Sequence, residues 1–224
     1  MLLTSAQQLS ADHKCAGYII SPWIGPTSIT ITDVYRNENV EISLELYLSL
    51  LSAYVDELHV CQRNPEKDQG YELNLSKKFY KKINELLSEI GYQDKELRNL
   101  ALELGRKVKQ QEDRYSRDKK IYDFISKMRK IKHYILDNLH AKIYAVLCYR
   151  DSIPNGVICI GSPNLTYSGL FLNDEILACI HLQEYDDQVK MLLEKSLKSF
   201  LNRCSTNEAS LNKAISGDTQ THRE

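Results

Sequence analysis

The sequence contains little glycine and proline, with 9 and 5 of these residues in a chain of 224. This scarcity excludes collagen-like and low-complexity chains, which need far more of both. The chain also lacks an excess of one charge, because 29 Lys and Arg nearly balance 30 Asp and Glu. The composition as a whole therefore carries no sign of nucleic-acid binding, and it predicts an ordinary globular protein with a sizeable core.

Long apolar runs are absent as well. No run approaches the roughly 18 residues that a membrane-spanning helix needs. The first residues, MLLTSAQQLSADHK, lack the basic start and the long apolar stretch of a secretory signal. We therefore expect a cytoplasmic protein with no membrane partner.

Closely spaced cysteines are also missing, although the chain has six cysteines: Cys15, Cys61, Cys148, Cys159, Cys179 and Cys204. None of them forms a CxxC pair, and most lie in apolar runs. We expect buried, reduced thiols rather than a disulfide framework. Ligand pairs at the spacing of zinc sites are missing too, so we expect no zinc site, and no sequence motif leads us to expect a cofactor.

Apolar periodicity predicts strands and helices in two separate parts of the chain. Residues 17–63 read as a strand, an alternating apolar piece, a helix and another strand, which is the start of an α/β layer. Residues 134–182 return to strands, and an amphipathic helix follows over 185–203. We expect a single domain over residues 1–204 and a flexible polar tail over residues 205–224.

A helical insertion of different composition is predicted over residues 71–132. Its first helix has apolar residues at spacings of three and four and stops at Gly91; these residues are Leu75, Phe79, Ile83, Leu86, Leu87 and Ile90. Two further helices are expected over 94–111 and 117–132. Residues 92–132 carry a net charge of +6, from 13 Lys and Arg against 7 Asp and Glu. The insertion is either a solvated face with intermixed charges or a basic element that meets a polyanion.

Polar pairs stand out in the second group of strands. His140 and Lys142 are two residues apart, so in a strand they share a face, opposite an apolar face. Beyond the turn signal at 154–156 lies a second pair at the same spacing, Ser162 and Asn164. A third pair, Asn173 and Glu175, follows before the last strand.

A hairpin centred near residue 153 would bring the first two pairs together. Opposed residue numbers then sum to about 306, so Lys142 faces Asn164 and Ser162 faces Tyr144. An imidazole, an ammonium group and two neutral hydrogen-bonding groups at one end of two strands suit a phosphoryl group. The alternative is a half-buried strand pair whose outer face is merely polar.

Together these residues resemble a known family. His140-Ala141-Lys142, Gly161-Ser162-Pro163-Asn164 and Asn173 with Glu175 resemble the HxK…GSxN…NxE pattern of the phospholipase D superfamily. The Ile-Ser-Pro-Trp of residues 20–23 is similar to the opening strand of its bacterial nuclease and restriction-enzyme branch. The resemblance covers residues 17–25 and 139–180. One departure is Leu147, which stands where the family pattern has a structural Asp.

This resemblance implies a phospholipase D-like α/β fold, a mixed sheet between helices with a helical insertion, and chemistry without a metal. Because the chain has a single HxK motif, the resemblance implies a homodimer with a composite site. One His140 would attack phosphorus and the His140 of the second copy would protonate the leaving oxygen. The remaining roles are phosphoryl binding by Lys142 and Asn164, a hydroxyl contact from Ser162, orientation of His140 by Glu175, and substrate binding by Asn173, Trp23 and Ser21.

The function that this resemblance implies is a DNA nuclease, in a restriction, DNA-modification or phage-defence system that includes other proteins. One alternative is a non-catalytic or partner-dependent nucleic-acid-binding module on the same fold, for which Leu147 leaves room. A second alternative is a phospholipase-type hydrolase. Such an enzyme would be expected to carry two motifs in one chain or a membrane anchor, and the sequence has neither.

Overall fold

The computed structural model of this chain describes residues 2–10, 13–33, 38–90, 94–166, 169–170 and 174–217. The chain divides into two compact units. The first, which we call the α/β unit, consists of Met1–Arg63 together with Asp123–Glu224. The second, the helical unit, consists of Asn64–Tyr122. The predicted insertion is therefore a unit of its own, with boundaries earlier than the expected 71 and 132.

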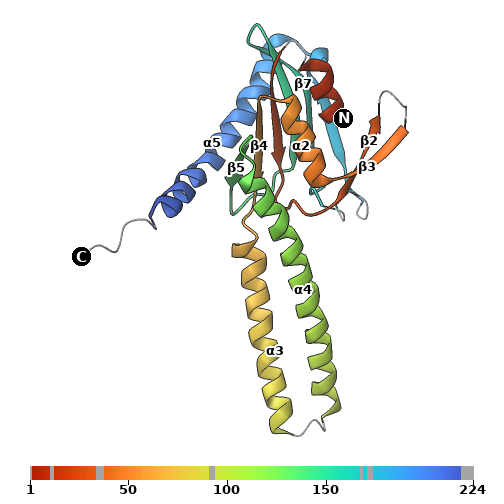
Figure 1. The fold of residues 1–224 in the computed structure, drawn as a ribbon, viewed down its shortest axis with the longest axis vertical. Helices are drawn as coiled ribbons and strands as arrows, with labels where there is room; N and C mark the ends of the chain where they lie inside the picture. Colours follow the sequence, from red (N-terminus) through yellow and green to blue (C-terminus); the bar gives the residue numbers. More distant parts are fainter. Residues whose placement is uncertain are drawn as a thin grey trace, which may run out of the picture. The chain divides into compact units, whose positions relative to one another are not determined.

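A six-stranded mixed sheet forms the centre of the α/β unit (Figure 1). Its strands lie in the order β5-β4-β1-β6-β7-β8; β1, β4 and β5 are parallel, whereas β6, β7 and β8 are each antiparallel to the preceding neighbour. The bounds are β1 (Lys14–Ile20), β4 (Glu57–Gln62), β5 (Ile131–Ile135), β6 (Ile143–Arg150), β7 (Ile153–Gly161) and β8 (Leu177–His181). A separate antiparallel ribbon pairs β2 (Ser28–Asp33) with β3 (Glu38–Ser43).

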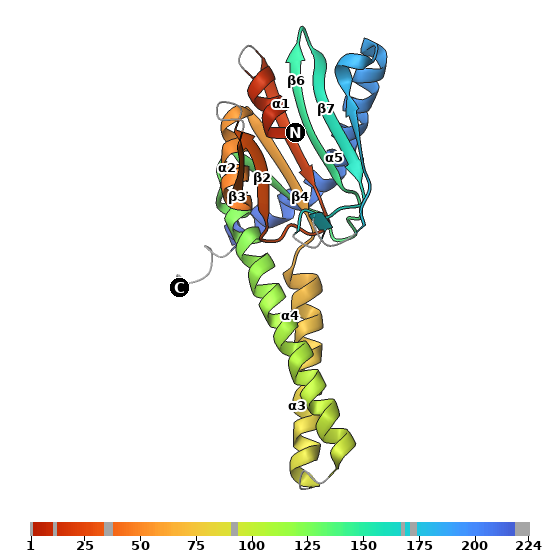
Figure 2. The same ribbon diagram turned by 90° about the vertical axis from the view of Figure 1, so that its right-hand side faces the viewer.

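Helices cover both faces of the six-stranded sheet (Figure 2). α1 (Leu2–Leu9) and α2 (Leu44–Tyr54) lie on one face, and α5 (Asp187–Gly217) lies on the other after a single turn at Leu182–Glu184. The predicted α/β class, with a mixed sheet between helices, is confirmed.

Apolar side chains on both faces of β6 pack against the helices on either side of the sheet. Ala145 and Leu147 are buried in one apolar cluster with Leu197 and Leu201 of α5. Tyr144 and Val146, which alternate with them, point to the α1 and α2 side, because successive side chains of a strand lie on opposite faces. Both sets are buried, which matches a central strand covered by helices on both sides.

Three of the predicted elements differ from the structure. The two helices expected over 94–111 and 117–132 are one helix, α4 (Lys95–Lys127). Residues 139–142, expected at the start of a strand, precede β6 and lie outside it. The last helix continues to Gly217 instead of ending at 203, so part of the expected flexible tail is helical. These differences lie at element ends, where local sequence signals are weakest.

The hairpin of β6 and β7 turns earlier than predicted. Its turn consists of Asp151 and Ser152, whose φ angles are 50° and 68°. Two consecutive positive φ values belong to the two-residue turn whose twist matches antiparallel strands. The expected turn at 154–156 is wrong, because these residues lie within β7. Tyr144 consequently pairs with Cys159 and not with Ser162.

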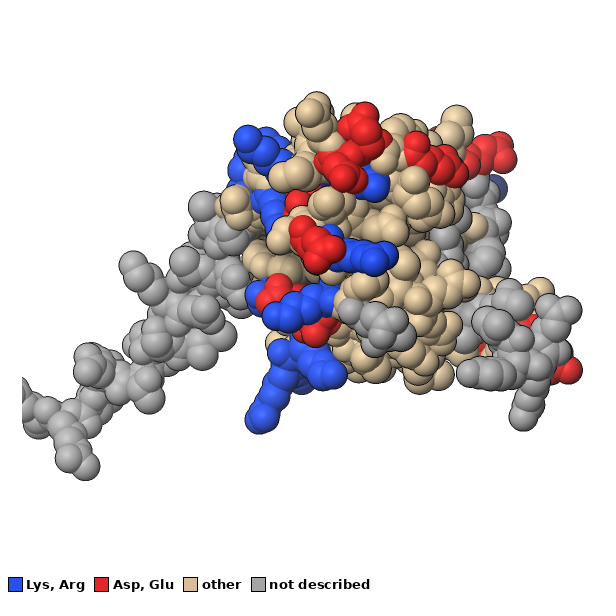
Figure 3. Space-filling model, turned by 90° about the horizontal axis from the view of Figure 1, so that it is seen from above, with Lys and Arg blue, Asp and Glu red and all other residues tan. Residues whose placement is uncertain are grey.

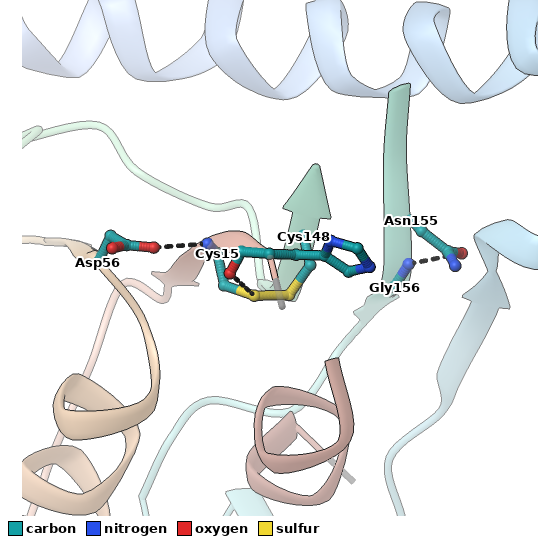
Figure 4. The surroundings of a disulfide bond; sticks show 6 residues. Cys15, Asp56, Cys148, Asn155 and Gly156 are labelled. Atoms are coloured by element: carbon teal, nitrogen blue, oxygen red, sulfur yellow. Dashed lines mark hydrogen bonds between the residues drawn. A yellow bond between two sulfur atoms is a disulfide. The ribbon is translucent and has the colours of Figure 1, made fainter. Parts of the chain in front are cut away.

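Four cysteines form disulfides, which corrects the expectation of six reduced thiols. Cys15 of β1 and Cys148 of β6 are directly opposed in the sheet and are bonded, as Figure 4 shows. Cys159 of β7 and Cys179 of β8 form the second cross-strand bond. Spacing along the chain could not reveal these pairs, because strand register alone brings them together. Disulfides persist mainly in oxidising compartments, so the cytoplasmic location stays a prediction.

The helical unit is built from α3 (Tyr71–Glu89) and α4, which follow a short turn at Glu66–Gly70. Its small core contains Ile83 and Leu87 of α3 and Ala101 of α4. An ion pair between Lys77 and Glu112 also joins the two helices. None of the helices in the described parts of the chain is long and apolar enough to cross a membrane.

Candidate active site

The candidate residues gather at one edge of the six-stranded sheet. Ser21 and Trp23 follow the end of β1, and the segment 140–142 precedes the antiparallel β6, so both segments lie at the same edge. The segment 161–164 ends β7, and Glu175 precedes β8, which places them at this edge too. It is also the edge where the parallel strands β1, β4 and β5 have their carboxyl ends, the usual location of ligand sites in α/β sheets.

The observed register of β6 and β7 changes which residues of the two candidate segments lie side by side. The Gly161 N–H donates to the Lys142 carbonyl at 3.2 Å, so Lys142 lies beside Gly161 and not opposite Asn164 as predicted. The two segments still lie close together, because β6 starts and β7 ends at the same edge of the sheet. Ser162 and Asn164 then lie in the segment that leaves the sheet directly after this contact.

Ser162 attaches the start of β8 to the end of β7. Its N–H donates to the Ile176 carbonyl at 2.9 Å, and its Oγ accepts from the Ile176 N–H at 3.0 Å. A Cβ atom on Gly161 would lie 2.1 Å from the same carbonyl oxygen, so only glycine permits this approach. The Ser162 hydroxyl proton is not used in these bonds, so the hydroxyl can still donate to a ligand.

Asn164 carries the clearest sign of an incomplete site. Its Oδ1 atom is buried and has no hydrogen-bond partner among the described residues. A buried, unpartnered amide costs free energy unless a ligand satisfies it. Rotation of the amide exchanges its oxygen and nitrogen, so the same position can offer an acceptor or a donor. The surrounding loop is tight, since a Cβ on Gly169 would lie 2.5 Å from the Asn164 carbonyl oxygen.

His140 is exposed and Lys142 is half-buried. Within the described parts of the chain, the His140 ring has no hydrogen-bond partner, so its predicted orientation by Glu175 stays a prediction. Glu175 lies close enough to Tyr144 to oppose ionisation of that hydroxyl, and burial is the larger cause that raises the pKa of Tyr144 to about 12. The protonated Tyr144 hydroxyl donates to the Pro163 carbonyl at 2.7 Å and so supports the loop before Asn164.

Ser21 connects the end of β1 to the same loop. Its buried hydroxyl donates to the Trp23 carbonyl at 2.9 Å and accepts from the Leu165 N–H at 3.2 Å. These contacts hold the loop in place, and the predicted contact of Ser21 with substrate stays a prediction. Asn173, the other predicted substrate-binding residue of the third pair, lies outside the described residues.

Two features of this edge were not predicted. The Arg63 guanidinium lies 5.3 Å from the centre of the Trp23 ring, and its Nε donates to the Asp137 carbonyl. Gln62 and His133 form a second pair, with 3.0 Å between their Nε2 atoms, and burial lowers the pKa of His133 to about 4. Arg63 follows directly after β4, which runs parallel to β1. That position in the sequence was the available indication that Arg63 lies at the same edge as Trp23.

No family model, curated protein or solved structure matches this chain. The function therefore has to be inferred from the residues at this edge of the sheet.

Proposed function

We propose that the protein is a metal-independent phosphodiesterase, a homodimeric DNA nuclease that acts through a phosphohistidine. The observation that carries this proposal is the meeting of the 140–142 and 161–164 segments at one edge of the sheet, with a buried amide oxygen on Asn164 that has no partner among the described residues. This supplies an imidazole, an ammonium group and neutral donors for one phosphoryl group.

The proposed reaction uses two copies of His140. One imidazole attacks phosphorus, forming a P–N bond while the bond to the leaving oxygen breaks, and the His140 of the second copy protonates that oxygen. The second imidazole then takes a proton from water as the water oxygen attacks phosphorus and the P–N bond breaks. Lys142 and Asn164 stabilise the charge that builds on the non-bridging oxygens.

DNA is the proposed substrate because α4 carries a basic row on one side. Arg98, Lys109 and Lys120 repeat every eleven residues, as do Arg106 and Arg117, and all five are exposed. Eleven residues are three helical turns, so the row stays on one side for about 33 Å. On the face that Figure 3 shows, by contrast, acidic and basic side chains lie side by side. We therefore assign the phosphate contacts to α4.

The decisive test is cleavage of single- and double-stranded DNA in excess EDTA. We expect His140→Ala to lose at least about 10³-fold in rate, because it removes both the nucleophile and the acid. His13→Ala is the matched control, since His13 precedes β1 at the opposite edge of the sheet. Cleavage that persists in His140→Ala would refute the mechanism.

If the wild-type protein does not cut DNA, the better-supported alternative is a nucleic-acid-binding module. The specific observation in its favour is the His140 ring, which lacks a hydrogen-bond partner among the described residues. Binding would then be measured at several salt concentrations, and Lys109→Ala or Lys120→Ala should each reduce the salt slope by about 1.

Asn164 gives a second test that separates function from stability. We expect Asn164→Leu to slow cleavage about 100-fold but to leave the free energy of unfolding equal or higher, because it removes a buried amide oxygen that has no partner among the described residues. Ser162→Ala is the control, and it should lose about 1 kcal/mol of stability with its bond to Ile176. A large loss of stability in Asn164→Leu would mean that the amide already has a partner.

A further inference from the structure

Two cysteines of the α/β unit remain as thiols, and they meet between the sheet and the last helix. Cys61 belongs to β4 and Cys204 to α5, and both are free. Both side chains are 0% exposed and lie in the same apolar cluster. The two thiol groups are hydrogen-bonded to each other. The fold therefore places in direct contact two sulfur atoms that lie on different elements, far apart in the sequence.

Contact between two thiols has a chemical meaning that one buried cysteine lacks. A single core cysteine behaves as a small apolar residue and by itself indicates no chemistry. Two thiols in contact can be joined by oxidation. The same chain has joined both of the other cysteine pairs that its fold brings together. Those bonds connect neighbouring strands, whereas a bond between Cys61 and Cys204 would connect the sheet to a helix.

Side-chain packing joins α5 to the sheet at this contact. Leu201 lies one turn before Cys204 and shares its apolar cluster. On the sheet, Cys61 is fixed by neighbours on both sides, because it pairs with Ile20 of β1 and with Tyr134 of β5. Packed helices can slide by small amounts or open locally. We therefore expect a movement of α5 both to admit an oxidant and to bring the sulfur atoms to bonding distance.

The two thiols differ in acidity, and the difference assigns their roles. Donation from the Cys61 S–H, helped by the Arg203 guanidinium, lowers the pKa of Cys204 despite its burial. The same hydrogen bond, together with burial, raises the pKa of Cys61. The thiolate is the form that attacks a disulfide. Cys204 is therefore the attacking residue, and Cys61 is the residue that closes the bond.

We propose that Cys61 and Cys204 form a redox-active dithiol that closes to a third, reversible disulfide between β4 and α5. With a small-molecule disulfide as oxidant, the Cys204 thiolate attacks one of its sulfur atoms, and one small thiolate leaves. The Cys61 thiol then loses its proton and attacks the Cys204 sulfur, so the second small thiolate leaves. Two protein thiols are oxidised, and one external disulfide is reduced to two thiols. This proposal goes beyond the proposed function and does not depend on it.

The test is a count of free thiols in the full-length protein before and after incubation with oxidised glutathione. The protein is denatured without reductant, alkylated with N-ethylmaleimide and analysed by mass spectrometry of the intact chain and of its peptides. We expect the labelled thiols to fall from two to none, with no glutathione retained and a peptide that links Cys61 to Cys204. The two cross-strand disulfides are the internal control and should map unchanged. Wild-type protein that keeps both labels, or that retains glutathione without the link, would overturn the proposal.

Two matched variants test the roles of the two thiols. Cys61→Ala should stop after the first step, so glutathione stays bound at Cys204. Cys204→Ala should take up glutathione at Cys61 at least about tenfold more slowly, because the Cys61 thiol is the less acidic of the two. Equal or reversed rates of uptake would overturn the assigned roles.

Oxidation should also fasten α5 to the sheet. We expect amide hydrogen exchange around Leu201 to slow at least about tenfold in the oxidised wild type. Exchange should stay unchanged in a variant that carries both Cys61→Ala and Cys204→Ala and is treated in the same way. Unchanged exchange in the linked wild type would overturn the role of the bond in holding α5. DNA cleavage is not read in any of these measurements, so an inactive protein would refute the nuclease and leave the redox pair standing.

Discussion

The α/β unit and the helical unit use their apolar residues in different ways. Strand residues of the α/β unit such as Ile19, Ile20 and Leu58 are fully buried, because helices cover both faces of the sheet. In the described part of the helical unit α3 and α4 pack mainly against each other, and a second set of apolar residues on α3 is exposed. A layered sheet hides its apolar residues by itself, whereas a two-helix hairpin leaves one side of each helix for contacts. The first unit positions side chains, and the second presents surfaces.

The largest expected difference between the units concerns the disulfides, since both join strands of the α/β unit and the helical unit has no cysteine. Reduction of Cys15–Cys148, whose residues are 133 positions apart, should lower the free energy of unfolding by about 5 kcal/mol by the chain-entropy argument. Chemical denaturation of oxidised and reduced protein measures the loss, and hydrogen exchange should confine it to the α/β unit. The unreduced, denatured protein should react at two thiols, Cys61 and Cys204; six reactive thiols would contradict the disulfides.

A second prediction compares two leucines. Leu147 is fully buried between the sheet and α5, so Leu147→Ala should cost about 2–5 kcal/mol of stability. Leu75 lies half exposed on α3, and Leu75→Ala should change the free energy of unfolding by less than about 0.5 kcal/mol. Urea denaturation at a concentration where the protein is not associated measures both. Equal losses would mean that the second set of apolar residues on α3 is covered within the monomer.

A third prediction is a pH dependence from a histidine of the α/β unit, since the helical unit has no histidine. Burial holds the pKa of His133 at about 4 in the folded protein, below its usual 6.5. Its contribution to stability is therefore complete above pH 6.5 and is lost as the pH falls towards 4, by about 3 kcal/mol in all. His133→Gln keeps a partner for Gln62 and should flatten the profile between these pH values in urea denaturation. An unchanged profile would show that His133 does not titrate with unfolding.

Much of the fold could be predicted from local patterns. Short apolar runs identified β4, β7 and β8, alternation identified β6, and helical periodicity identified α2 and α3, because each pattern reflects burial on one or both sides of an element. The candidate site was predicted as a meeting of two segments, and the structure places both at one edge of the sheet. Which residues face each other was predicted incorrectly. The turn at Asp151 and Ser152 sets that register, and neither glycine nor proline marks it.

The sequence alone determined the α/β class, the helical insertion and the candidate residues, because strand and helix periods and motif spacing are properties of neighbouring positions. Tertiary structure decided the cysteine pairs, the buried amide of Asn164 and the exposure of a second set of apolar residues on α3. Each of these depends on which distant segments become neighbours, through strand order, hairpin register and the number of helices that cover a face. Such neighbours are chosen by packing over the whole unit, and no local pattern encodes them.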